Sequence, residues 1–216
     1  MQKKQFIIYG ARGHGRALFY NLKNDGLDII CFIDRDKEII KNHIKNVEIY
    51  KNISEVNKNY PKKENIQMIL GVGGASSKDR KYLFEKVKKN KFSIEKYVSK
   101  SAEVANTSQL SQGVQVLLNS TIAGNVVLRE GVIINSGSIV EHDSEIGSFS
   151  HVAPGVTICG SVSIGEMSFI GAGSTILPNI KIGSNTIVGA GSVVTKDIDS
   201  NCISFGSPSK VIKSIE

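Results

Sequence analysis

The sequence predicts two parts of different fold class. An α/β N-terminal domain with a small Rossmann-like parallel sheet is followed by a left-handed parallel β-helix of hexapeptide repeats. A bulky aliphatic recurs at every sixth position from Val104 to Val194. Before this repeat, short apolar runs alternate with helical patterns, and the first run leads into a glycine-rich turn. The charge divides in the same way, because residues 1–100 hold 22 Lys/Arg against 11 Asp/Glu, whereas residues 101–216 hold 5 against 9.

The α/β domain is expected over residues 1–97. Apolar runs at 5–10, 28–34 and 68–74 are typical of buried strands. Helical patterns cover 17–22, ending near Gly26, and 79–90, and residues 92–98 lead into the repeat. Strands that alternate with helices predict a parallel sheet, in which ligands bind at the carboxyl ends of the strands.

A glycine-rich turn follows the first strand, with Gly10, Gly13 and Gly15 close together. It resembles a phosphate-binding turn without having the G-x-G-x-x-G spacing. Glycines let backbone N–H groups approach an anion, and the helix N-terminus adds a favourable dipole. Asp34, at the end of the second strand, is suited to accept hydrogen bonds from a ribose or a base. The alternative is a tight strand-to-helix turn without a ligand.

His14 lies inside this turn. It is either an imidazole beside a bound phosphate or sugar, or a solvent-facing loop histidine. A dinucleotide needs two half-sheets, and about one hundred residues supply only one. A sugar linked to a mononucleotide therefore fits this domain better than NAD.

The repeat domain is expected over residues 98–216. Four positions after each aliphatic stands a small or β-branched residue, such as Ser138 or Val156. Helices and ordinary strands have side-chain periods of about 3.6 and 2. A period of six indicates short strands and tight turns wound into a parallel β-helix, in which each aliphatic stacks on its equivalent one coil away. The aliphatics are Val104, Leu110, Val116, Ile122, Leu128, Ile134, Val140, Ile146, Val152, Ile158, Ile164, Ile170, Ile176, Ile182, Val188 and Val194.

The repeat contains two histidines, His142 and His151, which are nine residues apart. With three hexads per coil they fall on different faces of one prism, so only packing of prisms about a threefold axis would bring such faces together. His142 is expected to point outward from a turn between Glu141 and Asp143. A carboxylate beside an outward imidazole suits a general base for acyl transfer. The alternative is an exposed turn histidine with acidic neighbours.

Composition argues against membrane, secreted, disulfide-rich, zinc-binding and nucleic-acid-binding proteins. No run of 18 or more apolar residues occurs, and the first apolar run is too short for a signal peptide, so a cytoplasmic protein is expected. Cys31, Cys159 and Cys202 form no CxxC or Cys/His cluster, which argues against a disulfide framework and a zinc site. The lysines, including the run at 85–91, lack interleaved aromatics. This favours a solvated surface over a nucleic-acid interface and is compatible with phosphorylated substrates.

Several motifs together resemble a known family. These are GARGHGR at 10–16, INSGSIVEHDSEIG at 134–147, SHVAPGV at 150–156, IGAGSTILPN at 170–179, VGAGSVVTKDI at 188–198 and GSPSK at 206–210. Over nearly the whole chain they resemble the NeuD/PglD-like sugar acetyltransferases, which are hexapeptide-repeat acyltransferases. The resemblance implies a trimer of left-handed prisms without a metal, with acetyl-CoA bound in the cleft between adjacent prisms.

The resemblance also implies roles for individual residues of the prism. His142 corresponds to the general base, and Asp143 to the carboxylate that orients it, although some members have the longer Glu there. His151 corresponds to a histidine at the acetyl-CoA end of the cleft, and Asn135 to a residue near the substrate. Lys196 and Lys210 are expected partners for the coenzyme phosphates. Five glycines fall at turns where pantetheine could approach the backbone, unless turn geometry alone explains them: Gly160, Gly171, Gly173, Gly189 and Gly191.

The family's nucleotide-sugar site maps onto the N-terminal domain. The resemblance places Asp34 and Arg35 around the base, and Gly71 and Gly73 on the opposite lip of the pocket. Arg12 and Arg16 differ from the smaller or apolar residues of relatives. The residues expected around phosphate and sugar are Gly13, His14, Gly15 and Arg16.

The resemblance predicts an acetyl-CoA-dependent N-acetyltransferase that acts by direct transfer on a nucleotide-linked 4-amino-4,6-dideoxy sugar. O-acetylation of sialic acid or a related nonulosonic acid is the alternative within the family. A γ-type carbonic anhydrase is a competing class, but it needs three metal-binding histidines and the prism has two. A non-catalytic β-helix scaffold is the remaining possibility, and acetyl-CoA binding would distinguish it.

Overall fold

The computed structural model describes residues 4–36, 44 and 46–215. The chain forms two compact units, and each is considered by itself. The first comprises Met1–Gly73 and Asp79–Glu95, and the second comprises Gly74–Lys78 and Lys96–Glu216. The short segment Gly74–Lys78 therefore belongs to the second unit although residues of the first unit lie on both sides of it in the sequence.

The first unit contains a four-stranded parallel sheet in the order β3-β2-β1-β4. Its strands are β1 (Gln5–Tyr9), β2 (Asp28–Ile33), β3 (Glu48–Tyr50) and β4 (Ile66–Leu70). The three predicted strands are present, but the third ends at Leu70, so the glycine-rich residues 71–74 follow the strand rather than belong to it. β3 was not predicted, because three residues that include a glutamate give no period-two pattern.

Three described helices accompany this sheet: α1 (Gly13–Asn24), α3 (Ile53–Asn59) and α4 (Ser77–Lys89), of which Ser77 and Lys78 belong to the second unit. α1 begins four residues before the predicted Ala17, because the glycine-rich turn itself forms the first helical turn. α3 was not predicted. Its start is stabilised by the Asn52 side chain, which accepts a hydrogen bond from the Glu55 N–H at 3.0 Å, so an N-x-x-E capping signal was present in the sequence.

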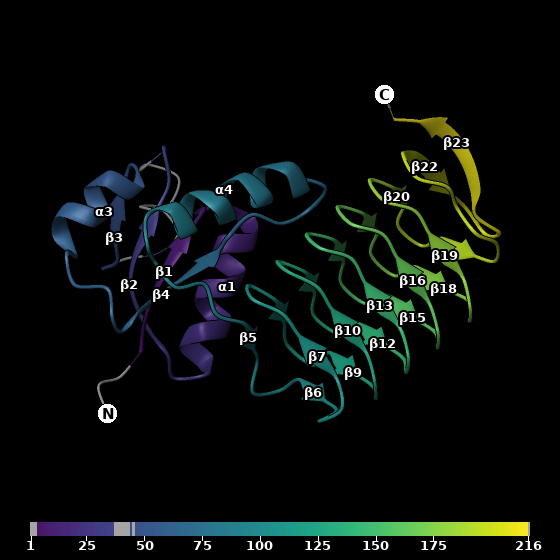
Figure 1. Cartoon of the computed structure of the whole chain (residues 1–216), viewed down its shortest axis with the longest axis horizontal. Helices are drawn as coiled ribbons and strands as arrows, with labels where there is room; N and C mark the ends of the chain where they lie inside the picture. The colour runs from purple at the N-terminus through teal and green to yellow at the C-terminus, as the bar shows by residue number, and fades with distance from the viewer. Residues whose placement is uncertain (1–3, 37–43, 45, 216) are drawn as a thin grey trace. The chain divides into compact units, whose positions relative to one another are not determined.

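The second unit is a parallel β-helix (Figure 1). Each aliphatic of the six-residue series is the second residue of a two-residue strand, and strands pair with equivalents 18 residues away, as Val127 does with Glu145. Three faces result: a five-stranded face (β19-β16-β13-β10-β7), a six-stranded face (β21-β18-β15-β12-β9-β6) and an eight-stranded face (β23-β22-β20-β17-β14-β11-β8-β5).

The bounds of these strands follow the repeat. They are β5 (Tyr97–Val98), β6 (Glu103–Val104), β7 (Gln109–Leu110), β8 (Gln115–Val116), β9 (Thr121–Ile122), β10 (Val127–Leu128), β11 (Ile133–Ile134), β12 (Ile139–Val140), β13 (Glu145–Ile146), β14 (His151–Val152), β15 (Thr157–Ile158), β16 (Ser163–Ile164), β17 (Phe169–Ile170), β18 (Thr175–Ile176), β19 (Lys181–Ile182), β20 (Ile187–Val188), β21 (Val193–Val194), β22 (Cys202–Phe205) and β23 (Lys210–Ser214).

The prism core consists of the stacked aliphatics, most of which are fully buried. The second series of small residues has its own structural reason. The hydroxyl of Ser150 donates to the Gly165 carbonyl at 2.8 Å and accepts from the Ser168 N–H at 2.9 Å, which joins successive coils. Ser168 repeats the pattern with the Gly183 carbonyl and the Thr186 N–H. These buried hydroxyls are thus hydrogen-bonded, as buried polar groups must be to avoid a desolvation cost.

The prism turns share one backbone feature. At every sixth position from Gly113 to Gly191 the residue three places after the aliphatic has positive φ. This left-handed conformation penalises a Cβ atom, and Gly, Asn and Asp tolerate it best. Phe149, Ser161 and Met167 occupy it nevertheless. The turns therefore share one backbone conformation and place their side chains at equivalent corners of successive coils.

Candidate functional site

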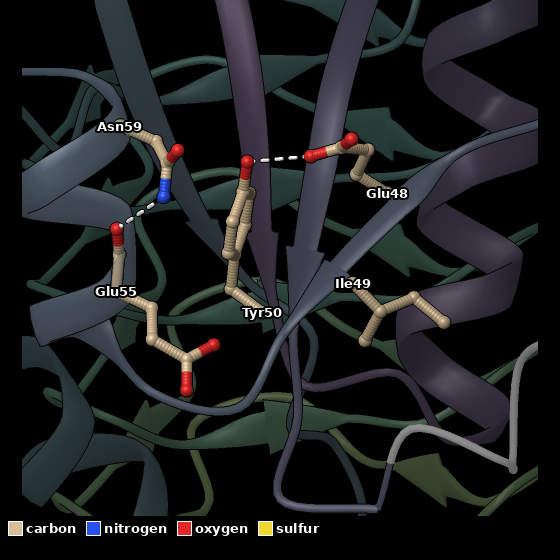
Figure 2. A pocket seen from close by; sticks show the side chains of 5 residues that line it. All are labelled: Glu48, Ile49, Tyr50, Glu55 and Asn59. Atoms are coloured by element: carbon tan, nitrogen blue, oxygen red, sulfur yellow. Dashed lines mark hydrogen bonds between the residues drawn. The ribbon is translucent and has the colours of Figure 1, made fainter.

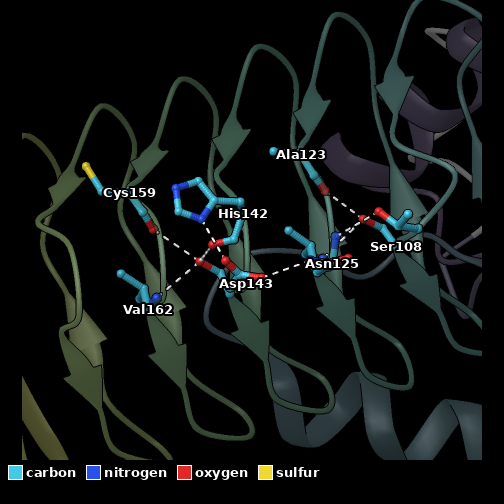
Figure 3. A network of polar contacts seen from close by, with 10 residues as sticks. Ser108, Ala123, Asn125, His142, Asp143, Cys159 and Val162 are labelled. Carbon is cyan, nitrogen blue, oxygen red and sulfur yellow. Dashed lines mark hydrogen bonds and ion pairs between the residues drawn. The ribbon is translucent and has the colours of Figure 1, made fainter.

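His142 lies at the corner between β12 of the six-stranded face and β13 of the five-stranded face. The turn geometry directs its side chain outward, and 61% of that side chain is exposed. Its Nδ1 lies 2.8 Å from Oδ2 of Asp143 (Figure 3). Because a carboxylate only accepts hydrogen bonds, Nδ1 carries the proton in the neutral ring. The lone pair available for a proton is therefore on Nε2.

Asp143 is held from a second direction. Its Oδ1 accepts a hydrogen bond from Nδ2 of Asn125 at 3.0 Å, one coil away (Figure 3). The hydrogen bonds from His142 and Asn125 lower the pKa of the Asp143 carboxyl below its ordinary value. Both Asn125 and Asp143 have positive φ, at 61° and 59°. Equivalent turns on successive coils thus place an amide, a carboxylate and an imidazole in one row.

Gly160 provides space for the His142 ring. A Cβ atom at Gly160 would lie 2.7 Å from both Cε1 and Nε2 of His142. Such a separation is shorter than van der Waals contact, so any larger residue would displace the imidazole. The structure gives this predicted coenzyme-binding glycine a steric role toward His142.

His151 lies on β14 of the eight-stranded face, away from the His142 corner, and only 4% of it is exposed. Its Nε2 lies 3.1 Å from Nδ2 of Asn135, and its Nδ1 lies 3.2 Å from the Gly74 carbonyl. The two residues that the resemblance placed near substrate and coenzyme thus contact each other. Within one prism they lie on a different side from His142, as the nine-residue separation of the two histidines predicted.

The glycines of the N-terminal unit bring three elements together. A Cβ atom at Gly15 would stand 1.9 Å from the Gly10 carbonyl oxygen, and one at Gly71 would stand 2.2 Å from the same atom. The ends of β1 and β4 and the start of α1 therefore meet only because these positions lack side chains. Gly13 is different, since a Cβ atom there would contact nothing within 4 Å. Sterics within the fold do not explain Gly13, because the position of its absent side chain, in the first turn of α1, is open.

The remaining predicted residues of this unit gather around the same strand ends. The His14 ring lies against Gly73, where a Cβ atom would stand 2.9 Å from Cγ of the ring. The Asp34 carboxylate accepts from the Ala11 N–H at 2.8 Å and from the Asp36 N–H at 3.1 Å. Asp34 thus braces the glycine-rich turn. Arg16 is half-buried in α1 and Arg35 is exposed after β2.

The other predicted coenzyme-binding residues divide by environment. Gly171 and Gly189 have no room for a side chain. A Cβ atom at Gly171 would stand 2.4 Å from the Ala190 nitrogen, and one at Gly189 would stand 1.7 Å from the Phe205 ring. Gly173 and Gly191 have positive φ in turns with open space around them. Lys196 and Lys210 are exposed.

A separate open pocket of about 360 Å³ lies beside β3 and α3 (Figure 2). It is lined by Glu48, Ile49, Tyr50, Glu55 and Asn59. The Tyr50 hydroxyl donates to Glu48, and this hydrogen bond raises the pKa of the tyrosine. The two carboxylates would repel a diphosphate, and none of the predicted site residues lines this pocket.

In the described part of the chain, no three His, Cys, Asp or Glu side chains are grouped so that they could bind a metal ion. Among those same residues, no helix is long and apolar enough to cross a membrane. Cys31 and Cys202 are buried, and burial raises the pKa of Cys31 to about 12.

Two family models match the chain. The PglD N-terminal domain matches residues 5–87, and the bacterial transferase hexapeptide (six repeats) matches residues 161–196. PerB from Caulobacter crescentus, solved in complex with CoA and GDP-perosamine, is 25% identical over 97% of each chain with a TM-score of 0.85. The chain is an acyltransferase that is similar over both units to the NeuD/PglD-like sugar acetyltransferases.

A second solved structure of this kind comes from Neisseria gonorrhoeae FA1090. It is the acetyltransferase domain of PglB in complex with acetyl coenzyme A, with 25% identity over 98% of this chain and 100% of that chain, and a TM-score of 0.88. The C. crescentus perosamine N-acetyltransferase was also solved with CoA and GDP-perosamine after replacement of one histidine by asparagine or by alanine. The similarity to these sugar acetyltransferases thus covers both units of the chain.

Sequence reasoning missed two kinds of residue in this NeuD/PglD-like site. Asn125 precedes Asp143 by one coil, so the 18-residue stacking distance was a usable signal. Gly74, which contacts His151 across 77 positions of sequence, left no such signal.

Proposed function

We propose that this protein transfers an acetyl group from acetyl-CoA to the amino group of a nucleotide-linked 4-amino-4,6-dideoxy sugar. The similarity to sugar acetyltransferases supports acyl transfer to a sugar. The relatives solved with CoA and GDP-perosamine, or with acetyl coenzyme A, support these co-substrates. Gly13 begins α1 and leaves the position of its side chain open, which suits the approach of a nucleotide-sugar phosphate to the helix N-terminus.

The observation that carries this proposal is the arrangement around His142. Asp143 holds the Nδ1 proton, Asn125 holds Asp143, and Gly160 leaves room for the ring. Nε2 remains as the basic atom of an exposed side chain. This is the arrangement that a general base requires, because orientation and tautomer are set before the substrate arrives.

The reaction balances with these groups. The sugar nitrogen attacks the thioester carbonyl carbon as Nε2 of His142 takes a proton from that nitrogen. The C–S bond then breaks, the acetyl group stays on nitrogen as an amide, and the proton passes to the CoA sulfur. The charged Asp143 stabilises the imidazolium formed in between. No cysteine is needed as an acyl carrier.

The other roles follow the family resemblance and remain part of the proposal. Acetyl-CoA lies in a cleft between adjacent prisms of a homotrimer, near Gly160, Gly171, Gly173, Gly189 and Gly191, with Lys196 and Lys210 toward its phosphates. The nucleotide sugar occupies the strand ends near Gly13, His14, Gly15, Arg16, Asp34, Arg35, Gly71 and Gly73. A backbone N–H group or a neighbouring side chain stabilises the oxyanion.

The test is an assay of the purified protein with acetyl-CoA and a panel of acceptors. The panel contains nucleotide-linked 4-amino-4,6-dideoxy sugars, the corresponding 4-hydroxy sugars, and free sialic acids. We expect thiol release only with the amino sugars, and a product heavier by one acetyl group. Sedimentation of the same sample should show a trimer.

The control is His142→Asn, which keeps a donor near Nδ1 but lacks the basic Nε2. Thiol release with sialic acid alone would assign O-acetylation instead. Binding of acetyl-CoA without turnover of any acceptor, or equal turnover by His142→Asn, would overturn the proposed mechanism.

A further inference from the structure

The segment Gly74–Lys78 is bound to the surface of the prism by two side-chain hydrogen bonds. Nδ1 of His151 lies 3.2 Å from the Gly74 carbonyl, and the hydroxyl of Ser77 donates to the Met167 carbonyl at 3.1 Å. These bonds join parts of the chain that are 77 and 90 residues apart in sequence. Local folding does not create them, so they are specific tertiary contacts.

The hydrogen-bond network determines the tautomer of His151. The Gly74 carbonyl only accepts, so Nδ1 is the donor. The side-chain Oδ1 of Asn135 accepts from the Ser136 N–H at 2.9 Å, so Nδ2 of the same amide faces Nε2 of His151 as a donor. Nε2 must therefore accept. The neutral ring with its proton on Nδ1 satisfies every one of these contacts, whereas a second ring proton would place two donors 3.1 Å apart.

Burial makes this network stronger than a surface contact. Both His151 and Ser77 are only 4% exposed, and the His151 ring packs edge-on against Phe169 with centroids 5.4 Å apart. A buried donor that loses its acceptor pays a desolvation cost, so the contacts are maintained together. Met167 has positive φ, which is unfavourable for its side chain, and its carbonyl is the acceptor for Ser77.

The bound segment directly continues a strand end of the predicted nucleotide-sugar site. Gly71 and Gly73 follow β4, Gly73 lies against the His14 ring, and Gly74 is the next residue. Gly74 itself has positive φ and begins a turn. Whatever restrains Gly74 therefore restrains the backbone that bears Gly71 and Gly73.

We propose that His151 is a positioning residue for the nucleotide-sugar site. With Ser77 it anchors Gly74–Lys78 to the prism, and Asn135 orients its ring. This inference rests on the proposed function for its kinetic consequence only. It differs from a direct contact of His151 with acetyl-CoA, which would require Nε2 to give up Asn135 or Nδ1 to give up Gly74.

Two substitutions separate these roles. Asparagine places its amide nitrogen close to the position of Nδ1, and glutamine places its amide nitrogen close to the position of Nε2. His151→Asn should therefore retain the bond to Gly74, and His151→Gln should lose it. A contact through Nε2 to acetyl-CoA predicts the reverse order. Ser77→Ala removes the second anchor without touching His151, and Ser163→Ala on the exposed five-stranded face is the matched control.

Hydrogen–deuterium exchange of the full-length protein tests the anchor without any assay of activity. We expect His151→Gln and Ser77→Ala to speed amide exchange in residues 74–78 by about two- to tenfold, the effect of one ordinary hydrogen bond. His151→Asn and Ser163→Ala should stay close to the unsubstituted protein. Unchanged exchange in both His151→Gln and Ser77→Ala would overturn the anchor.

Steady-state kinetics tests the consequence. His151→Gln and Ser77→Ala should raise KM for the nucleotide sugar by about two- to tenfold, with a smaller change in KM for acetyl-CoA. A larger rise in KM for acetyl-CoA, stronger for His151→Asn than for His151→Gln, would assign His151 to the coenzyme instead. Absence of acetyltransferase activity in the unsubstituted protein would refute the proposed function. The hydrogen–deuterium exchange result would still decide whether the anchor exists.

Discussion

The corner that carries His142 and the face that carries His151 place the same side chain in different environments. The side chain of His142 is 61% exposed, and its Nδ1 faces a carboxylate. His151 is 4% exposed, and both of its ring nitrogens are engaged by neutral groups. Position in the repeat therefore sets the environment of each imidazole. A turn leaves an oriented imidazole exposed, whereas an outward position on a covered strand engages the imidazole in buried hydrogen bonds.

The largest difference should come from placing asparagine at each position in turn. His142→Asn keeps a donor toward Asp143 but removes the base, so kcat/KM should fall by about 10²- to 10⁴-fold. His151→Asn keeps the donor toward Gly74 and should cost no more than about tenfold. Steady-state assays with saturating acetyl-CoA measure both. Equal losses in the two variants would contradict the division of roles.

Asp143→Asn removes the carboxylate while keeping a residue that tolerates the positive φ of this turn. The imidazolium formed during transfer then loses its charged partner, so kcat should fall by about ten- to a hundredfold, the value of a charge-assisted hydrogen bond. The melting temperature should change little, because the group is exposed. A kcat equal to that of the unsubstituted protein would show that His142 acts without Asp143.

Gly160→Ala tests the space beneath the ring. The added methyl group would stand 2.7 Å from Nε2 of His142 and displace the imidazole, so kcat should fall about tenfold. Gly124→Ala is the matched control at the equivalent turn one coil on the other side of His142, where the nearest atom is Oγ1 of Thr107 at 3.3 Å. A rise in KM for acetyl-CoA with unchanged kcat would instead support the coenzyme role predicted for Gly160.

The smallest effect is expected at Asn125. Asn125→Gly keeps the backbone conformation but removes one hydrogen bond to Asp143, so kcat should fall by about two- to fivefold. The pKa of Asp143 should rise toward its ordinary value, because one of the two hydrogen bonds that lower it is gone. Carboxyl NMR titration measures this, with Asn119→Gly as the control at another corner. An unchanged titration would remove Asn125 from the site.

The sign of the pH dependence follows from the same carboxyl. The pKa of Asp143 is lowered in the folded state, so its stabilising contribution is present above the ordinary titration range of aspartate. The contribution is lost only as the pH falls through the lowered value. In Asn125→Gly this contribution should be smaller, and its loss should be complete at a higher pH.

The sequence alone determined the prism, because one aliphatic residue in each hexad marks the six-residue period. Each aliphatic from Val104 to Val194 occupies the inner position that the period assigns to it, and the small residues four places later join the coils. The outward position of His142 and its neighbour Asp143 followed from the same period. In the first unit, β3 and α3 escaped prediction because their segments are too short to show a period.

Only the tertiary structure decided what each histidine contacts. Asn125 reaches Asp143, and Gly160 reaches the His142 ring, through stacking of coils, which a coil length of 18 residues makes partly predictable. The bond between His151 and Gly74 depends on the path of a connection far away in sequence. Periodicity encodes contacts that recur, whereas a single contact between distant segments is set by the packing of the folded chain.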